Sequence, residues 1–147
     1  MTRLRLAPAI LLLLAACQPH SADPHVEKAW VRLAAVPGQP SAAYFTLEGG
    51  DKAESLVKVE SALADRAELH QSMTGTQGMM TMKPLENVAV PAGGTVAFKP
   101  GGRHVMLYGL DKVVQPGVAV PLRFVFADGK TASTEAKAVS AGADAPY

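Results

Sequence analysis

Short runs in which apolar and polar residues alternate, separated by Gly and Pro, constrain the fold of this chain more than any other feature. The runs follow one another from Val26 to Val139, with breaks such as Pro37-Gly38 and Pro116-Gly117 between them. A period of two is typical of β-strands with one buried face, whereas Gly and Pro mark turns. Because no stretch shows sustained helical periodicity, the sequence predicts an all-β fold.

The pattern predicts eight to ten short strands that form one antiparallel β-sandwich or barrel. The length of 147 residues fits a single domain of this kind. Asp128-Gly129 predicts a hairpin between the last two strands. The candidate strands are residues 26–33, 42–47, 56–59, 67–70, 79–82, 88–90, 95–98, 105–108, 118–126 and 130–139.

The first sixteen residues are typical of a secretory signal. Two arginines precede an apolar run from Leu6 to Ala16, which is about half the ~20 residues that a membrane-spanning helix needs. The run ends in Leu14-Ala15-Ala16-Cys17, which resembles the bacterial lipobox. This resemblance implies cleavage before Cys17 and lipidation of Cys17, which would anchor the protein to a membrane. An ordinary secreted protein with a chance cysteine is the alternative.

These features divide the chain into four parts. We expect residues 1–16 to be a lipoprotein signal peptide and residues 17–25 to be a lipidated tether. Residues 26–140 form the expected single domain, and residues 141–147 a flexible tail. The processed chain would lie in the periplasm, and Gln18 after the cysteine favours an outer-membrane over an inner-membrane anchor by analogy with Gram-negative sorting.

The composition excludes several classes of function. The single Cys allows no intramolecular disulfide, no CxxC pair and no blue-copper site once lipid occupies it. A formal charge of +1 without a Lys/Arg cluster gives no case for nucleic acid. No Ser/His/Asp or paired-carboxylate pattern stands at a recognisable spacing, so we expect no enzyme.

Methionine and histidine gather in one part of the chain. His104 and Met106 are two residues apart in a candidate strand, so their side chains project from the same face. Thioether sulfur together with imidazole selects Cu(I), whereas Mg²⁺ and Ca²⁺ prefer oxygen ligands. A Met in a β-sheet can equally serve only as packing. Apart from the initiator, the methionines are Met73, Met79, Met80, Met82 and Met106.

The spacing of His70, Met82, His104 and Met106 resembles the motif of the periplasmic copper A chaperone family. Met82 lies twelve positions after His70, and His104 lies twenty-two after Met82. The family's optional Met directly after the first His is Gln71 here. The resemblance covers about residues 26 to 139 and includes Ala29-Trp30-Val31-Arg32, Glu68-Leu69-His70, Met80-Thr81-Met82-Lys83-Pro84 and Gly101-Gly102-Arg103-His104-Val105-Met106-Leu107.

The resemblance implies a cupredoxin-like sandwich that binds one Cu(I) through those four residues. It also implies a monomeric metallochaperone that delivers copper to the copper A site of cytochrome c oxidase. The implied acceptor is subunit II of the oxidase or a Sco-type thiol protein. A periplasmic copper storage or tolerance protein, and a structural lipoprotein without metal, are the alternatives. The sequence assigns no role to Met73, Met79, Met80, His20 or His25.

Overall fold

The computed structural model describes residues 21–147. The expected signal peptide, Cys17 and the first part of the tether therefore lie outside the described residues, and the predictions for them stay predictions. Within residues 21–147, no helix is long and apolar enough to cross a membrane.

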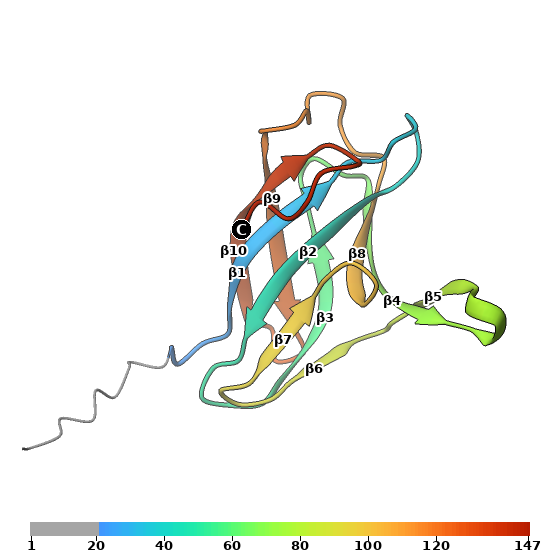
Figure 1. Cartoon of the computed structure of the whole chain (residues 1–147). Helices are drawn as coiled ribbons and strands as arrows, with labels where there is room; N and C mark the ends of the chain where they lie inside the picture. Colours follow the sequence, from blue (N-terminus) through green and yellow to red (C-terminus); the bar gives the residue numbers. More distant parts are fainter. Residues whose placement is uncertain (1–20) are drawn as a thin grey trace, which may run out of the picture.

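Ten β-strands build the domain, and one short 3₁₀ turn, η1 (Thr76–Gly78), lies between the fourth and the fifth (Figure 1). Each segment that the alternation predicts to be a strand is one, with several ends shifted by one or more residues. The strands are β1 (His25–Arg32), β2 (Ser41–Glu48), β3 (Glu54–Glu60), β4 (Arg66–Thr74), β5 (Met80–Pro84), β6 (Val88–Val90), β7 (Thr95–Phe98), β8 (Arg103–Tyr108), β9 (Ala119–Phe126) and β10 (Thr131–Val139).

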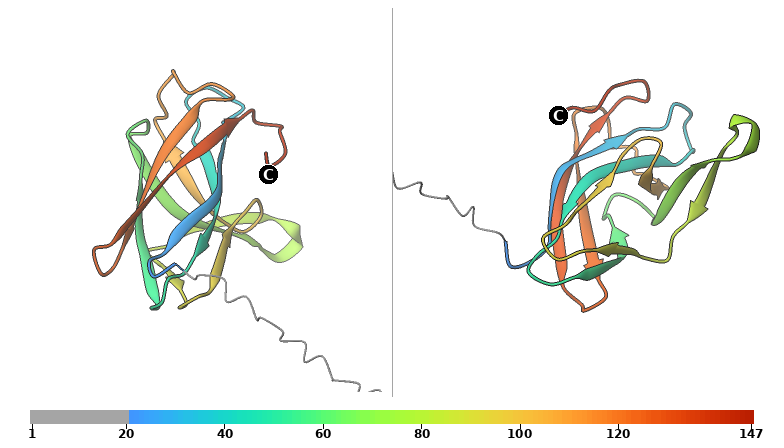
Figure 2. Two further views of the ribbon diagram at one scale, coloured as in Figure 1. Left: turned by 90° about the vertical axis from the view of Figure 1, so that its left-hand side faces the viewer. Right: turned by 60° about the horizontal axis from the view of Figure 1, so that its bottom comes forward.

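The strands form one sheet in the order β5-β4-β8-β7-β2-β1-β10-β9-β3-β6, with an additional pairing of β8 with β2. The sheet curls into a half-barrel around the core, as the views in Figure 2 show. Most neighbours are antiparallel, as expected, but β1 runs parallel to β10 and β7 runs parallel to β8. The all-β, cupredoxin-like class predicted from the sequence is confirmed.

The core lies inside the curl and follows the alternation of the strands. In β9, Val120, Leu122, Phe124 and Phe126 are buried, while the residues between them face outward. The Phe45 ring lies between two others, with centroid distances of 4.2 Å to Phe98 and 4.8 Å to Phe124. Burial of each such side chain contributes about 1.5–3 kcal/mol to the stability of the fold, so the core needs no disulfide.

A β-bulge in β1 changes which residues of this strand face the core. Val26 is paired with Leu47, and Trp30 with Tyr44, with one extra residue in β1 between these pairs. Lys28 absorbs the extra residue with a φ of 51°, in the left-handed region. Because of this shift Val31 joins the core and Trp30 lies on the outer face of the sheet, opposite Tyr44.

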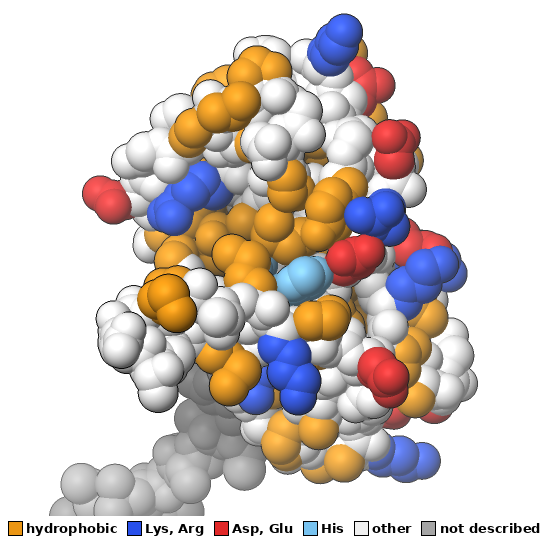
Figure 3. Space-filling model, turned by 90° about the vertical axis from the view of Figure 1, so that its right-hand side faces the viewer, with side chains coloured by type: hydrophobic (Ala, Val, Ile, Leu, Met, Phe, Trp, Pro, Cys, Tyr) orange, Lys and Arg blue, Asp and Glu red, His pale blue; other side chains and the backbone are white. Residues whose placement is uncertain are grey.

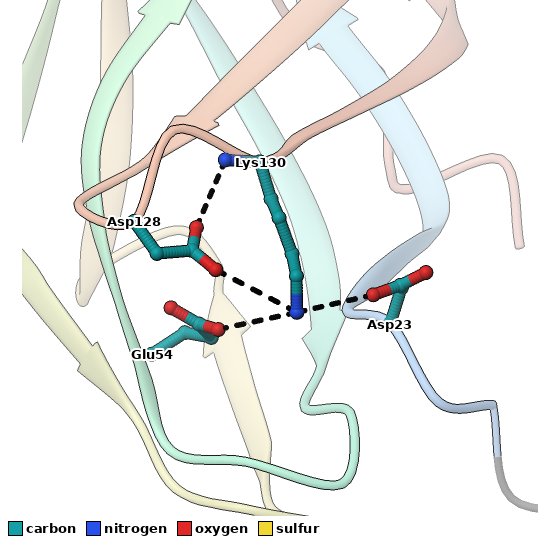
Figure 4. A network of polar contacts seen from close by, with 4 residues as sticks. All are labelled: Asp23, Glu54, Asp128 and Lys130. Atoms are coloured by element: carbon teal, nitrogen blue, oxygen red, sulfur yellow. Dashed lines mark hydrogen bonds and ion pairs between the residues drawn. The ribbon is translucent and has the colours of Figure 1, made fainter.

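A lysine ties the start of the domain to the hairpin between β9 and β10 (Figure 4). Lys130 Nζ lies 3.2 Å from an Asp23 oxygen, 3.5 Å from Glu54 and 3.6 Å from Asp128. Asp128-Gly129 forms the turn of the predicted hairpin, with Gly129 at a φ of +88°. The network thus joins Asp23, which precedes β1, to the start of β3 and to the β9–β10 hairpin.

The last residues pack back on β1. Arg32 Nη2 donates a hydrogen bond to the Ala143 carbonyl at 3.1 Å, and the Tyr147 hydroxyl donates to the Ala29 carbonyl at 3.4 Å. These contacts place the C-terminal segment against β1. The expected flexibility of residues 141–147 stays a prediction.

Replacing the central core aromatic, Phe124→Ala, should lower the free energy of unfolding by about 3–5 kcal/mol, because it removes a fully buried ring and leaves a cavity. Val113 is 62% exposed, so Val113→Ala serves as the control and should change the free energy of unfolding by less than about 0.5 kcal/mol. Urea unfolding followed by tryptophan fluorescence measures both. Equal effects of the two variants would contradict the described core.

Candidate metal centre

The pairing of β4 with β8 brings two of the predicted ligands directly opposite each other. His70 is the register partner of His104 in this antiparallel pair. The neighbouring partners, Leu69 and Val105, point into the core. Because side chains alternate along a strand, both imidazoles lie on the outer face of the sheet.

Although they face away from the core, the two imidazoles are largely covered. His104 is 3% exposed and the His70 side chain 12%. Their ring centroids lie 5.9 Å apart, and the Tyr44 ring lies 6.4 Å from that of His104. The Trp30 ring extends this row, 4.6 Å from Tyr44. Figure 3 shows a histidine side chain at the centre of this face, with hydrophobic groups around it and an acidic group beside it.

The backbone fixes the tautomer of His104. Its Nδ1 lies 3.1 Å from the Gly102 carbonyl oxygen, which can only accept, so Nδ1 carries the proton and donates. Nε2 is then the nitrogen with the free lone pair. Within the described residues 21–147, this buried Nε2 has no hydrogen-bond partner. A buried lone pair without a donor is costly unless a ligand uses it.

A carboxylate fixes the tautomer of His70 in the same way. His70 Nε2 lies 3.2 Å from Glu68 Oε2, while its Nδ1 is buried and has no partner in the described part of the chain. The hydrogen bond from His70 lowers the pKa of the Glu68 carboxyl, and Arg66 acts in the same direction. Glu68 therefore stays ionised and accepts a hydrogen bond from the Nε2–H group of His70. A carboxylate behind an imidazole is the usual support of a metal-binding histidine.

Burial also keeps His104 neutral. Loss of solvation lowers the pKa of His104 below its ordinary value of 6.5, and repulsion from His70 lowers it further, whereas the Gly102 carbonyl opposes both. At neutral pH the His104 ring is therefore uncharged, with its Nε2 lone pair available.

The two predicted methionine ligands lie on the same face as the imidazoles. Met106 follows His104 by two residues, is half-buried and pairs with Glu68. Met82 lies on β5, where it is the partner of Ser72, two residues beyond His70. Three adjacent strands, β5, β4 and β8, thus present all four side chains on one face. Met82 is 58% exposed, because the hairpin of β4 and β5 projects from the body (Figure 1).

This arrangement can bind a soft cation. Two imidazoles each offer one buried lone pair, and two thioethers stand on the flanking positions of the same face. All four donors are neutral, which suits a singly charged soft ion. Within residues 21–147 no group of three or more His, Cys, Asp or Glu side chains could hold a metal. That these four residues bind a metal stays a prediction.

Sequence reasoning did not assign a role to Glu68, Tyr44 or Gly102. Glu68 could have been found from the alternation, since it stands two residues before His70 in the same strand. Tyr44 lies on β2 and reaches His104 only because β2 pairs with β8. No local pattern in the sequence indicates that contact.

A family model and a curated relative both match this chain. The family model described as "Putative lipoprotein LpqE-like" matches residues 25–138. "Putative lipoprotein Lxx21020" of Leifsonia xyli subsp. xyli is 31% identical over 106 residues, which are 72% of this chain. The chain spans 63% of the length of that curated relative.

Solved structures of copper-binding domains have the same fold. The copper-bound PCuAC domain from PmoF2 matches with a TM-score of 0.64 and 21% identity, covering 78% of this chain and 91% of that domain. Cu(I)-bound DR1885 from Deinococcus radiodurans matches with a TM-score of 0.57 and 28% identity, covering 85% of this chain and 81% of the other. The resemblance to copper A chaperones, expected from the sequence, is confirmed for the fold.

Glu68→Gln should disturb the tautomer of His70, because an amide can present its NH₂ group to Nε2 and leave the proton on Nδ1. The ¹⁵N chemical shifts of the ring should move from an Nε2-protonated form toward a mixture. Affinity for a metal bound at Nδ1 should fall about tenfold. Glu60→Gln is the matched control, since Glu60 is also a strand carboxylate paired with an arginine, Arg123. An unchanged His70 spectrum in Glu68→Gln would contradict this role.

Proposed function

Since this chain belongs to the LpqE-like lipoprotein family and has the fold of PCuAC domains, we propose that it is an extracytoplasmic copper chaperone. It binds one Cu(I) through His70, Met82, His104 and Met106 and passes it to another protein. Lipidated Cys17 holds it at a membrane facing the periplasm, with the outer membrane favoured. The Cu(I)-bound relative DR1885, at 28% identity, supports the choice of metal.

One observation carries this proposal: the free nitrogens of the facing histidines. His70 Nδ1 and His104 Nε2 are buried without partners in the described chain, while the other nitrogen of each ring is engaged. Such a pair is arranged for an ion that accepts two neutral nitrogen ligands. The thioethers of Met82 and Met106 on the same face favour Cu(I) over Zn²⁺, which prefers imidazole, thiolate or carboxylate.

The donor set also supports release of the metal. Neutral thioethers bind Cu(I) less tightly than thiolates, so an acceptor with cysteine ligands gains the ion. In each exchange one Cu–S bond to a methionine breaks as one Cu–S bond to a cysteine forms, and the thiol proton goes to solvent. Copper remains Cu(I) throughout. Exposed Met82 is the ligand that an incoming thiolate reaches first.

We propose that the acceptor is the copper A site in subunit II of cytochrome c oxidase, directly or through a Sco-type thiol protein. Both kinds of acceptor supply thiolates, to which the neutral site can lose its ion. A storage or tolerance protein would instead retain its copper in the presence of such an apo-acceptor. Anaerobic transfer from the loaded protein to each candidate apo-acceptor distinguishes the two.

Removal of one ligand should abolish tight binding while leaving the fold intact. We expect the wild-type protein to bind one Cu(I), and His104→Ala and Met106→Leu to bind it at least ~100-fold more weakly, a larger loss than for a supporting residue. Anaerobic titration against a competing chelator measures this, and circular dichroism checks the sheet. No copper stoichiometry in the wild-type protein would indicate a structural lipoprotein instead.

Affinity for Cu(I) should depend on pH in one direction. Protonation of an imidazole removes the lone pair that binds copper, so affinity should fall as the pH drops below about 6 and stay level above pH 7. Burial lowers the pKa of His104, which moves the loss at this ligand to lower pH. The titration is repeated from pH 8 to pH 5, with the chelator calibrated at each pH. A constant affinity from pH 7 to pH 5 would argue against histidine ligands.

A further inference from the structure

Four exposed methionines lie on a single hairpin, and the proposed copper site uses only one of them, Met82. Met73, Met79, Met80 and Met82 are 50%, 64%, 60% and 58% exposed and belong to the arm formed by the end of β4, η1 and β5. The views in Figures 1 and 2 show this arm projecting from the half-barrel. A protein that needed these side chains only for packing would bury them.

The pairing of β4 with β5 determines on which face of the arm each methionine lies. Met82 is opposite Ser72 and Met80 is opposite Thr74, so both thioethers lie on the face that carries His70. Met73 is opposite Thr81 and projects from the other face. Met80 and Met82 are alternate residues of one strand, about 7 Å apart along it. With three rotatable bonds each, both sulfurs can turn toward one ion.

The arm has a defined conformation that holds Met80 toward this face. The Gly75 amide donates to the Met79 carbonyl at 2.7 Å and closes the bend, in which Gln77 and Gly78 adopt φ angles of 66° and 76°. The Thr74 hydroxyl lies 3.5 Å from Met80 Sδ and donates to it.

We propose that Met80 and Met82 form an entry site that captures Cu(I) on the arm before the ion reaches the histidine pair. This inference rests on the proposed function and adds a second, outer binding position to it. Met82 belongs to both positions. The ion moves inward when the bond from copper to Met80 sulfur breaks and a bond to an imidazole nitrogen forms, with no change of oxidation state and no proton transferred.

An entry site should affect the rate at which the protein takes up Cu(I) rather than its equilibrium affinity for Cu(I). Met80→Leu keeps size and apolarity but removes the sulfur. Loading of the protein from a weak Cu(I) chelator, followed by stopped flow, should slow about tenfold, while the equilibrium affinity should change by less than about twofold. Met73→Leu is the matched control, with a thioether on the same arm but on the opposite face, and should load as the wild-type protein does.

A second measurement observes the outer position directly. In the double variant His70→Ala/His104→Ala, Cu(I) should still shift the ¹³C-methyl signals of Met80 and Met82 together and leave that of Met73 in place. Adding Met80→Leu to this variant should abolish the Met82 shift. Loss of both shifts in the double variant would overturn the entry site.

The outcomes separate this inference from the proposed function. If the wild-type protein binds no Cu(I), both are wrong. If it binds one Cu(I) but Met80→Leu loads as fast as the wild-type protein, only the entry site is wrong. Equal slowing by Met80→Leu and Met73→Leu would also overturn it, since the thioethers of the arm would then act without regard to the face on which they lie.

Discussion

The register between β4 and β8 is the constraint on which the rest of the candidate site depends. It places His70 directly opposite His104 and, two residues along, Glu68 opposite Met106. A shift of β4 by one residue against β8 would turn His70 into the core and bring Leu69 to the outer face. Burial of Leu69 and Val105, which stand next to His70 and His104 in the two strands, fixes this register. These apolar residues therefore hold the histidines in place.

The surroundings of the two rings give the site its chemical character. The Gly102 carbonyl and the Glu68 carboxylate each accept a hydrogen bond from one ring N–H, which leaves one buried, unprotonated nitrogen per histidine. Covering by Tyr44 and the neighbouring strands keeps His104 neutral. A pair of neutral nitrogens next to neutral sulfur can hold a soft monovalent ion and still lose it to a thiolate. The neutral donors that bind the ion therefore also limit how tightly the ion is held.

Much of this fold could be predicted because strands with one buried face must alternate in sequence. In β9 and β10 the alternation and the Asp128-Gly129 turn are enough to predict both strands and their hairpin. Strand β1 shows why other parts of the fold could not be predicted from the sequence. Continued alternation from Val26 would place Trp30 in the core, but the bulge at Lys28 moves it to the outer face beside Tyr44. The cost of a left-handed Lys is offset by tertiary packing, which no local pattern reports.

The sequence by itself determined the all-β class, the candidate donor residues and their chemical softness, since these depend only on periodicity and on the identity of the side chains. The tertiary structure decided which nitrogen of each ring is free, because that depends on Gly102 and Glu68. It also decided that Met80 and Met82 lie on the face that carries His70. Side-chain and backbone conformation set the first relation and strand pairing sets the second, and neither can be inferred from the sequence pattern alone.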